Sequence, residues 1–232
     1  MASYQGHLAF STLLGTGYGV AAALQGQMDW GPVFLGTGLT ALGGLLPDLD
    51  SDSSVPVREV FGLAAAAAPF LLMQRVTNLG FSTEQTLVIL GGVYLIIRYG
   101  LRTLLAKITV HRGMFHSIPA MLIAGLLVFL LYHSPSALIR LYLAGGVMLG
   151  FLSHLVLDAI YDVDLMGSKL RPTNHTGGPL KFFSPSWLAS LTTYGVLGSL
   201  VYAVYLQLNP QNDTWRIWQS QALKVFSVYF NR

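Results

Sequence analysis

The chain has 232 residues, of which 53% are hydrophobic and only 10% are charged, with a formal net charge of +3. Soluble globular proteins carry about 25% charged residues, so this composition indicates a membrane protein. The sequence has no dense run of Lys or Arg, which argues against a nucleic-acid partner. Because there is no cysteine, disulfides and thiolate metal ligands are excluded.

Long uncharged stretches recur along the chain. No charged residue occurs from Leu8 to Met28, from Trp30 to Pro47 or from Phe182 to Asn212. These lengths are close to the roughly 20 residues with which a helix crosses a bilayer. We therefore predict an all-α, polytopic membrane helix bundle whose first two segments form a tight helical hairpin. About seven apolar segments are expected, at residues 8–27, 31–46, 60–74, 86–106, 118–132, 141–160 and 187–208.

The C-terminal end has a different pattern. Aromatic residues such as Trp215, Trp218 and Phe226 recur at intervals typical of one helix face, while the charged residues fall elsewhere. This periodicity predicts an amphipathic helix lying on the membrane surface. We therefore expect one membrane-embedded domain over residues 1–210 and an amphipathic tail over residues 211–232.

The polar residues sort to one side when the apolar segments are threaded alternately across a bilayer. Five of the six histidines then share a face with the aspartates of "LPDLDSDS". The loops on this face carry more Lys and Arg than the internal loops on the opposite face, so the positive-inside rule favours the cytoplasm for it. Ionisable residues near membrane segments are costly unless paired or functional, which makes this face the candidate site.

Three motifs on this face have side chains that suit a metal ion: the aspartates of "LPDLDSDS" and the two motifs "HLVLD" and "HRGMFHS". In "HLVLD", His154 and Asp158 are spaced i,i+4, so on a helix they project from one side and can share a metal. The histidines of "HRGMFHS" flank a glycine that allows a tight turn. Each motif alone also fits an ordinary helix cap, turn or interfacial ion pair. Together they predict between one and three divalent ions, with zinc favoured and manganese or iron as alternatives, held by His7, Asp48, Asp50, His111, His116, His154 and Asp158.

The motifs "GHL", "LPDLD", "HRGMFHS" and "GFLSHLVLD", in this order, resemble the YdjM-like, LexA-regulated family of membrane-bound predicted metal-dependent hydrolases of the bacterial inner membrane. The resemblance covers residue 5 to about residue 160. It implies the same seven metal ligands, with Arg112 and Ser117 beside them. The chain departs from the family pattern in two places, by two additional apolar segments between Asp50 and His111 and by "IYDVDLMGSKLRP" after Asp158. The pattern is also distantly similar to zinc-dependent phospholipase C, whose helical fold gathers several His and Asp ligands.

We therefore expect a metal-dependent hydrolase that acts on a phosphate ester or ester of an amphiphilic, lipid-like substrate through a metal-activated water. Asp50 or Asp52 is the expected general base. Arg112 is expected to neutralise developing charge. The expected substrate-binding residues are Arg112, Ser117, Lys169 and Arg171.

Two alternatives remain open at this stage: an ion or metal transporter, and a metal-binding membrane protein without catalysis. A transporter predicts polar residues spread through the membrane depth, whereas here the candidate ligands lie at one end of the apolar segments.

Overall fold

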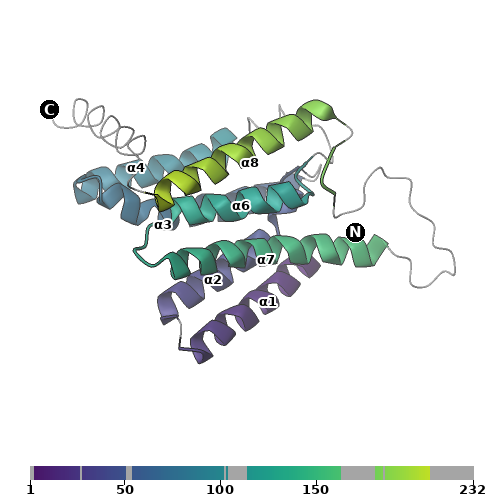
Figure 1. Ribbon diagram of the computed structural model, residues 1–232, viewed down its shortest axis with the longest axis horizontal. Coiled ribbons are helices and arrows are strands. Elements are labelled where there is room, and N and C mark those ends of the chain that lie inside the picture. Colours follow the sequence, from purple (N-terminus) through teal and green to yellow (C-terminus); the bar gives the residue numbers. More distant parts are fainter. Residues whose placement is uncertain are drawn as a thin grey trace.

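The computed structural model describes residues 3–26, 28–50, 54–101, 103, 114–162, 181–184 and 186–209. Apart from an isolated β-bridge between Ser117 and Lys181, the secondary structure in these residues is helical, which confirms the all-α class (Figure 1). A 3-10 helix, η1 (Leu46–Asp50), and a π-helical turn, η2 (Ile96–Leu101), occur among longer helices. The α-helices are α1 (Tyr4–Leu24), α2 (Trp30–Gly43), α3 (Ser54–Thr77), α4 (Thr83–Leu95), α6 (Ile118–Leu131), α7 (Ala137–Asp162) and α8 (Trp187–Leu208).

Local sequence explains where several helices begin. Ser3 is the N-cap of α1, and its hydroxyl accepts a hydrogen bond from the backbone N–H of Gly6 at 3.1 Å. Ser82 and Gln85 form a reciprocal capping box at the start of α4. Between α1 and α2 the chain turns at Gly26, whose φ of 64° suits a residue without a side chain. The two helices pack along each other, so the expected helical hairpin is confirmed.

Three of the described helices are long and apolar enough to cross a membrane: α3 over Val57–Thr77, α7 over Ala137–Ile160 and α8 over Trp187–Leu208. A shorter apolar helix is α6. With 14 residues, α2 rises only about 21 Å, less than the roughly 30 Å of a bilayer core. A helix lies at each of the seven expected apolar segments, but seven membrane crossings are not confirmed.

The third expected segment, residues 60–74, is too short. Helix α3 begins at Ser54 and runs through Pro69 to Thr77. The charged residues Arg58 and Glu59, which ended the apolar stretch in the sequence, are good helix formers and continue the helix. Apolar length therefore underestimated helical length here.

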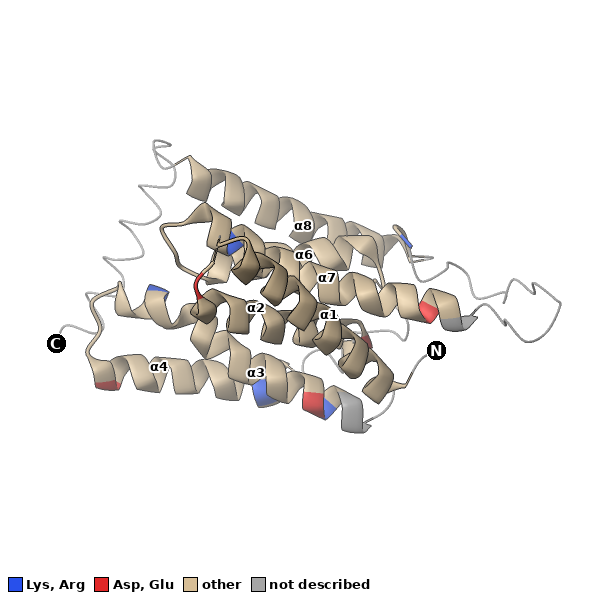
Figure 2. Ribbon diagram, turned by 90° about the horizontal axis from the view of Figure 1, so that it is seen from below, with Lys and Arg blue, Asp and Glu red and all other residues tan. Residues whose placement is uncertain are grey.

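Helix α7 is the centre of the bundle. In its membrane-length window 56% of the residues are buried, against 6% in α8, which packs on α6 at the periphery. Helices α1, α2 and α6 all contact α7. Most charged residues lie toward the ends of the helices, so the middle of the bundle is apolar (Figure 2).

Glycines allow α2 and α7 to approach closely. A side-chain carbon at Gly43 would collide with the backbone of Val147, and one at Gly150 would collide with the carbonyl of Thr40. Small residues at helix contacts are typical of membrane bundles. This contact fixes the end of α2 against α7 one turn before His154.

Candidate metal centre

The i,i+4 pair His154 and Asp158 lies on one face of α7, as the spacing predicted. His154 Nε2 is 3.6 Å from Asp158 Oδ2. Both residues are buried, with 1% of His154 and 4% of Asp158 exposed. A buried histidine and carboxylate can therefore offer lone pairs to one common point inside the bundle.

The tautomer of His154 follows from its second nitrogen. His154 Nδ1 lies 2.8 Å from the carbonyl oxygen of Gly44, at the end of α2. A carbonyl can only accept a hydrogen bond, so Nδ1 carries the proton and donates it. In a neutral ring Nε2 then holds a lone pair, and this atom has no hydrogen-bond partner among the described residues. A backbone carbonyl that fixes one nitrogen while the other points at a metal is the usual arrangement of a histidine ligand.

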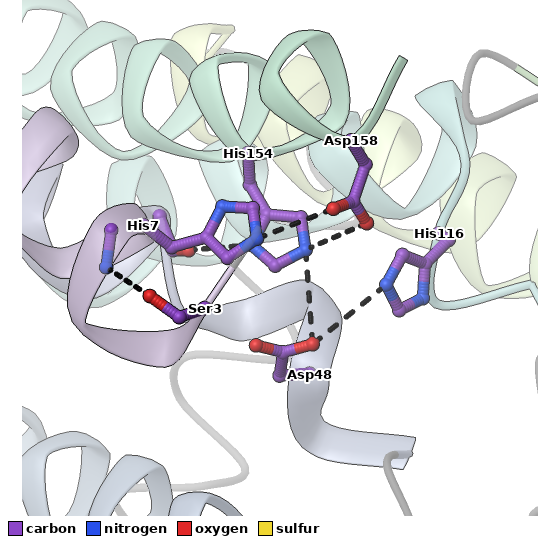
Figure 3. Close-up of polar contacts among 8 residues, drawn as sticks. Ser3, His7, Asp48, His116, His154 and Asp158 are labelled. Carbon is purple, nitrogen blue, oxygen red and sulfur yellow. Dashed lines mark hydrogen bonds and ion pairs between the residues drawn. The ribbon is translucent and has the colours of Figure 1, made fainter. Parts of the chain in front are cut away.

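His7 joins this pair from the first helix. Its ring stacks on His154 with centroids 3.7 Å apart and an interplanar angle of 14°. His7 Nε2 is 3.3 Å from Asp158 Oδ1. His7 is buried, with only 3% of the residue exposed. The first turn of α1 therefore supplies a third donor to the buried side of the cluster (Figure 3).

Asp48 and His116 form the accessible side of the same cluster. Asp48, in η1, places Oδ1 3.8 Å from His154 Nε2 and 4.0 Å from His116 Nε2. His116 immediately precedes α6, and its ring meets His154 edge-on with centroids 5.4 Å apart. The Asp48 and His116 side chains are 22% and 14% exposed, so solvent or a substrate can reach this side. Figure 3 shows the contacts that join Asp48 to His154 and to His116.

The spacing of these atoms fits a shared cation better than direct hydrogen bonds. The four His–Asp separations range from 3.3 to 4.0 Å, whereas N–H···O hydrogen bonds measure about 2.7–3.2 Å. Two ligands about 2.05 Å from one tetrahedral zinc ion stand about 3.3 Å apart. Two groups of residues have ligand atoms close enough together that they could hold a metal ion: His7, His154 and Asp158, and Asp48, His116 and His154.

His154 belongs to both groups, which limits how ions can be arranged. Because Nδ1 donates to Gly44, only the Nε2 lone pair is available, and one lone pair binds one ion. An ion that uses His154 would therefore be held either with His7 and Asp158 or with Asp48 and His116, and a second ion would have to be held without His154. The nitrogen and oxygen donors suit zinc, and manganese or iron also accept such ligands.

The cluster therefore brings together five of the seven predicted ligands. The side chain of Asp50 and residues Asp52, His111, Arg112, Lys169 and Arg171 lie outside the part of the chain that the structure describes, so their roles as ligands, general base and substrate contacts stay predictions.

Ser117 is the N-cap of α6. Its buried hydroxyl donates to the carbonyl of Met114 and accepts from the backbone N–H of Ala120 at 3.3 Å. This capping confirms the start of the helix at Ile118, as the sequence indicated. The predicted contact of Ser117 with substrate is a separate claim that the capping bonds do not address.

Two contributors to the site were not recognised in the sequence. The Gly44 carbonyl is one, because a backbone acceptor has no side-chain signature. Tyr4 is the other: burial, followed by the negative charges of Glu59 and Asp48, raises the pKa of its phenol. The charge of Asp48 therefore acts on the Tyr4 side chain. Its position three residues before His7 on one helix face was the available signal.

Comparison with known proteins agrees with the motif resemblance. A family model described as YdjM inner membrane protein matches residues 1–222, which include every residue of the cluster. Searches of curated proteins and of solved structures each found no match, so the distant likeness to zinc-dependent phospholipase C gains no support from them. The family description places its members in the inner membrane, in agreement with the three helices that can cross a bilayer. The chain therefore belongs to the YdjM inner membrane protein family.

Proposed function

We propose that this protein is a membrane-bound, metal-dependent hydrolase that acts on a phosphate ester or ester of an amphiphilic substrate. The observation that carries the proposal is the orientation of His154. Its Nδ1–H is fixed by Gly44, and its Nε2 faces the carboxylates of Asp48 and Asp158 at 3.8 and 3.6 Å. A buried lone pair held between two carboxylates is favourable when a cation lies between them.

The residues divide into a holding side and an accessible side. The holding side consists of three buried residues, His7, His154 and Asp158. It would hold an ion rigidly, because the rings of His7 and His154 stack and the Gly44 carbonyl orients His154. Asp48 and His116 are partly exposed and would complete the site where a substrate can approach. When bound, a divalent ion supplies Lewis acidity and lowers the pKa of a coordinated water toward neutrality.

The position of the cluster supports hydrolysis over transport. A transport path needs ligands through the depth of the bundle. Between Arg140 and Asp158, α7 has no charged residue, and its buried middle carries Leu143 and Val147. The described ligands lie at one end of the helices, where an amphiphile can present its polar group while its apolar part stays in lipid. The cytoplasm is the proposed side for this end, from the distribution of Lys and Arg.

Metal content is the first test. The protein would be purified in detergent, loaded with zinc, passed through a desalting column and measured by elemental mass spectrometry. We expect stoichiometric zinc in the wild type and a trace in Asp158→Asn, which keeps the shape but removes a charged ligand. Asp29→Asn is the matched control, because Asp29 is an exposed carboxylate at the start of α2. Equal zinc in all three proteins would contradict the site.

Catalysis is tested separately. Long-chain phosphate monoesters and carboxylic esters would be offered in mixed micelles, with product release followed by mass spectrometry. We expect turnover by the zinc-loaded wild type and by Asp29→Asn, and none by Asp158→Asn. Bound zinc with no turnover of any ester would replace the hydrolase proposal with non-catalytic metal binding.

A further inference from the structure

An open, apolar groove lies between α1 and α7. Its volume is about 310 Å³, and five of its lining residues come from α1. None of the lining residues is charged. They are Phe10, Leu13, Leu14, Gly17, Tyr18 and Leu149.

The groove begins beside the metal centre. Phe10 and Leu14 follow His7 at i+3 and i+7, so they lie on the same side of α1, and Phe10 is within one helical turn of His7. From His7 to Tyr18 the helix rises about 16 Å. The lining therefore leads from the polar cluster toward the middle of the bundle.

Tyr18, the lining residue farthest from His7 along α1, is held in place by an aromatic partner. The Tyr18 hydroxyl donates to the carbonyl of Tyr142 at 3.0 Å, and the two rings stack with centroids 4.6 Å apart. The only side-chain hydroxyl of the lining is thus already hydrogen-bonded. At Gly17 a side-chain carbon would meet no atom within 4 Å, so the absent side chain leaves part of the groove empty.

We propose that this groove binds the hydrocarbon chain of the substrate, so that the enzyme acts on long-chain amphiphiles whose polar group reaches the metal centre. The inference rests on the proposed hydrolase function and extends it to the substrate class. The apolar lining from Phe10 to Tyr18 follows the polar cluster at His7 along one helix, and this order matches the two parts of such a molecule. Contact of the chain with these residues would hold the molecule beside the cluster and position its ester at the candidate metal centre.

The test fills the groove without changing a ligand. Gly17→Leu projects a side chain into the empty space, and Leu149→Trp fills it from α7. Gly38→Leu is the matched control, since Gly38 is an exposed glycine on α2 that also has no atom within 4 Å of a side-chain carbon. Zinc content and thermal unfolding of all variants would be measured first. If one of the two groove-filling variants does not fold, the other is used in its place.

Binding is read with a long-chain alkyl phosphate that carries a photoreactive group at its chain end. We expect crosslinks within residues 10–18 in the wild type and in Gly38→Leu. In Gly17→Leu or Leu149→Trp they should fall by about tenfold, the effect of a mismatched apolar pocket. Crosslinks that are unchanged by filling, or that lie mainly on other helices, overturn the proposal. Crosslinks between two copies of α1 overturn it in favour of a dimer contact.

Kinetics separate this inference from the hydrolase proposal. We expect kcat/KM for a long-chain ester to fall about tenfold in Gly17→Leu, while kcat/KM for a butyl ester with the same headgroup stays unchanged. An equal fall for both esters would contradict a chain-binding groove. Wild-type protein that crosslinks in the groove but hydrolyses neither ester would disprove the hydrolase function and leave the amphiphile site.

Discussion

The two ends of the bundle both bury ionisable side chains, but they satisfy them differently. At the end away from the metal centre, Arg140 donates from Nε and Nη2 to the carbonyl of Phe129 at 3.1 and 2.8 Å, and from Nη2 to Gln207 Oε1 at 2.6 Å. Its guanidinium also lies 3.9 Å from the Phe129 ring centroid. Arg75 donates to the carbonyl of Leu131 at 2.9 Å. These carbonyls belong to the last turn of α6, where helices lack internal donors, so both arginines cap that helix.

At the end with the candidate metal centre, two buried ring nitrogens are left without a hydrogen bond to the described part of the chain. His7 Nδ1 and His154 Nε2 have no hydrogen-bond partner among the residues described, although both side chains are buried. Unsatisfied buried polar atoms cost stability unless a ligand completes them. The comparison teaches that burial of charge is not itself a functional signal. Incomplete satisfaction of converging donors is the feature that distinguishes the metal centre from the arginine caps.

The largest effect on the candidate metal centre is expected from His154→Ala, which removes the ligand common to both groups. We expect the affinity for zinc to fall by more than about 100-fold, since losing an orienting partner alone costs about 10–100-fold. Competition with a fluorescent zinc chelator measures it. A zinc affinity that is unchanged from wild type would show that His154 is a core histidine.

Arg140→Met is expected to lower the stability of the protein and to leave its zinc affinity unchanged. It leaves the Phe129 carbonyl and Gln207 without their donor, so the free energy of unfolding should fall by about 2–4 kcal/mol. Thermal and denaturant unfolding in detergent would detect the change, with zinc affinity measured alongside. Arg75→Met, which loses one hydrogen bond, should cost less. A loss of zinc affinity in Arg140→Met at retained stability would mean that the two ends are coupled.

Much of the arrangement of the candidate metal centre could be predicted from the sequence, because it depends on helix periodicity and segment parity. The i,i+4 spacing placed His154 and Asp158 on one face, and an even number of inserted segments kept His116 at the same end as Asp48. The capping chemistry of Ser117 set the start of α6. Helix spacing, the alternation of segments across the membrane and helix capping depend on residues that are close in the sequence, so they can be predicted without knowing how the helices pack.

Features set by contact between distant segments could not be predicted. The tautomer of His154 depends on a carbonyl 110 residues earlier in the chain. The role of Arg140 as a helix cap could not be predicted either, because its partners Phe129 and Gln207 lie on other helices. The groove depends on how α1 and α7 diverge. Hydropathy also gave the wrong length for α3, since charged helix formers extend it beyond its apolar stretch.

Helix packing links the two ends through α7, and Gly150→Ala tests this link. The added methyl group would collide with the Thr40 carbonyl and push α2 away from α7. We expect the free energy of unfolding to fall by about 1–3 kcal/mol, the usual cost of overpacking. Zinc affinity should fall too, because Gly44 moves with α2 and no longer orients His154. Gly38→Ala is the control: its side chain meets open space, so stability should change by less than about 1 kcal/mol and zinc affinity not at all. Equal behaviour of the two variants would refute the role of close packing.

The smallest expected effect comes from Ser117→Ala, which lies next to His116 and separates a cap from a substrate contact. Loss of the hydrogen bond to the Ala120 N–H should lower the free energy of unfolding by about 1 kcal/mol. Ser82→Ala, the N-cap of α4, removes the same kind of bond at 3.3 Å to Gln85 and is the matched control. Because the Ser117 hydroxyl is buried and already donates to Met114, we expect both variants to keep the wild-type zinc affinity and the wild-type KM for a long-chain ester. A rise in KM confined to Ser117→Ala would show that this hydroxyl also meets the substrate, as the motif "HRGMFHS" predicts, and would extend the metal centre to the first turn of α6.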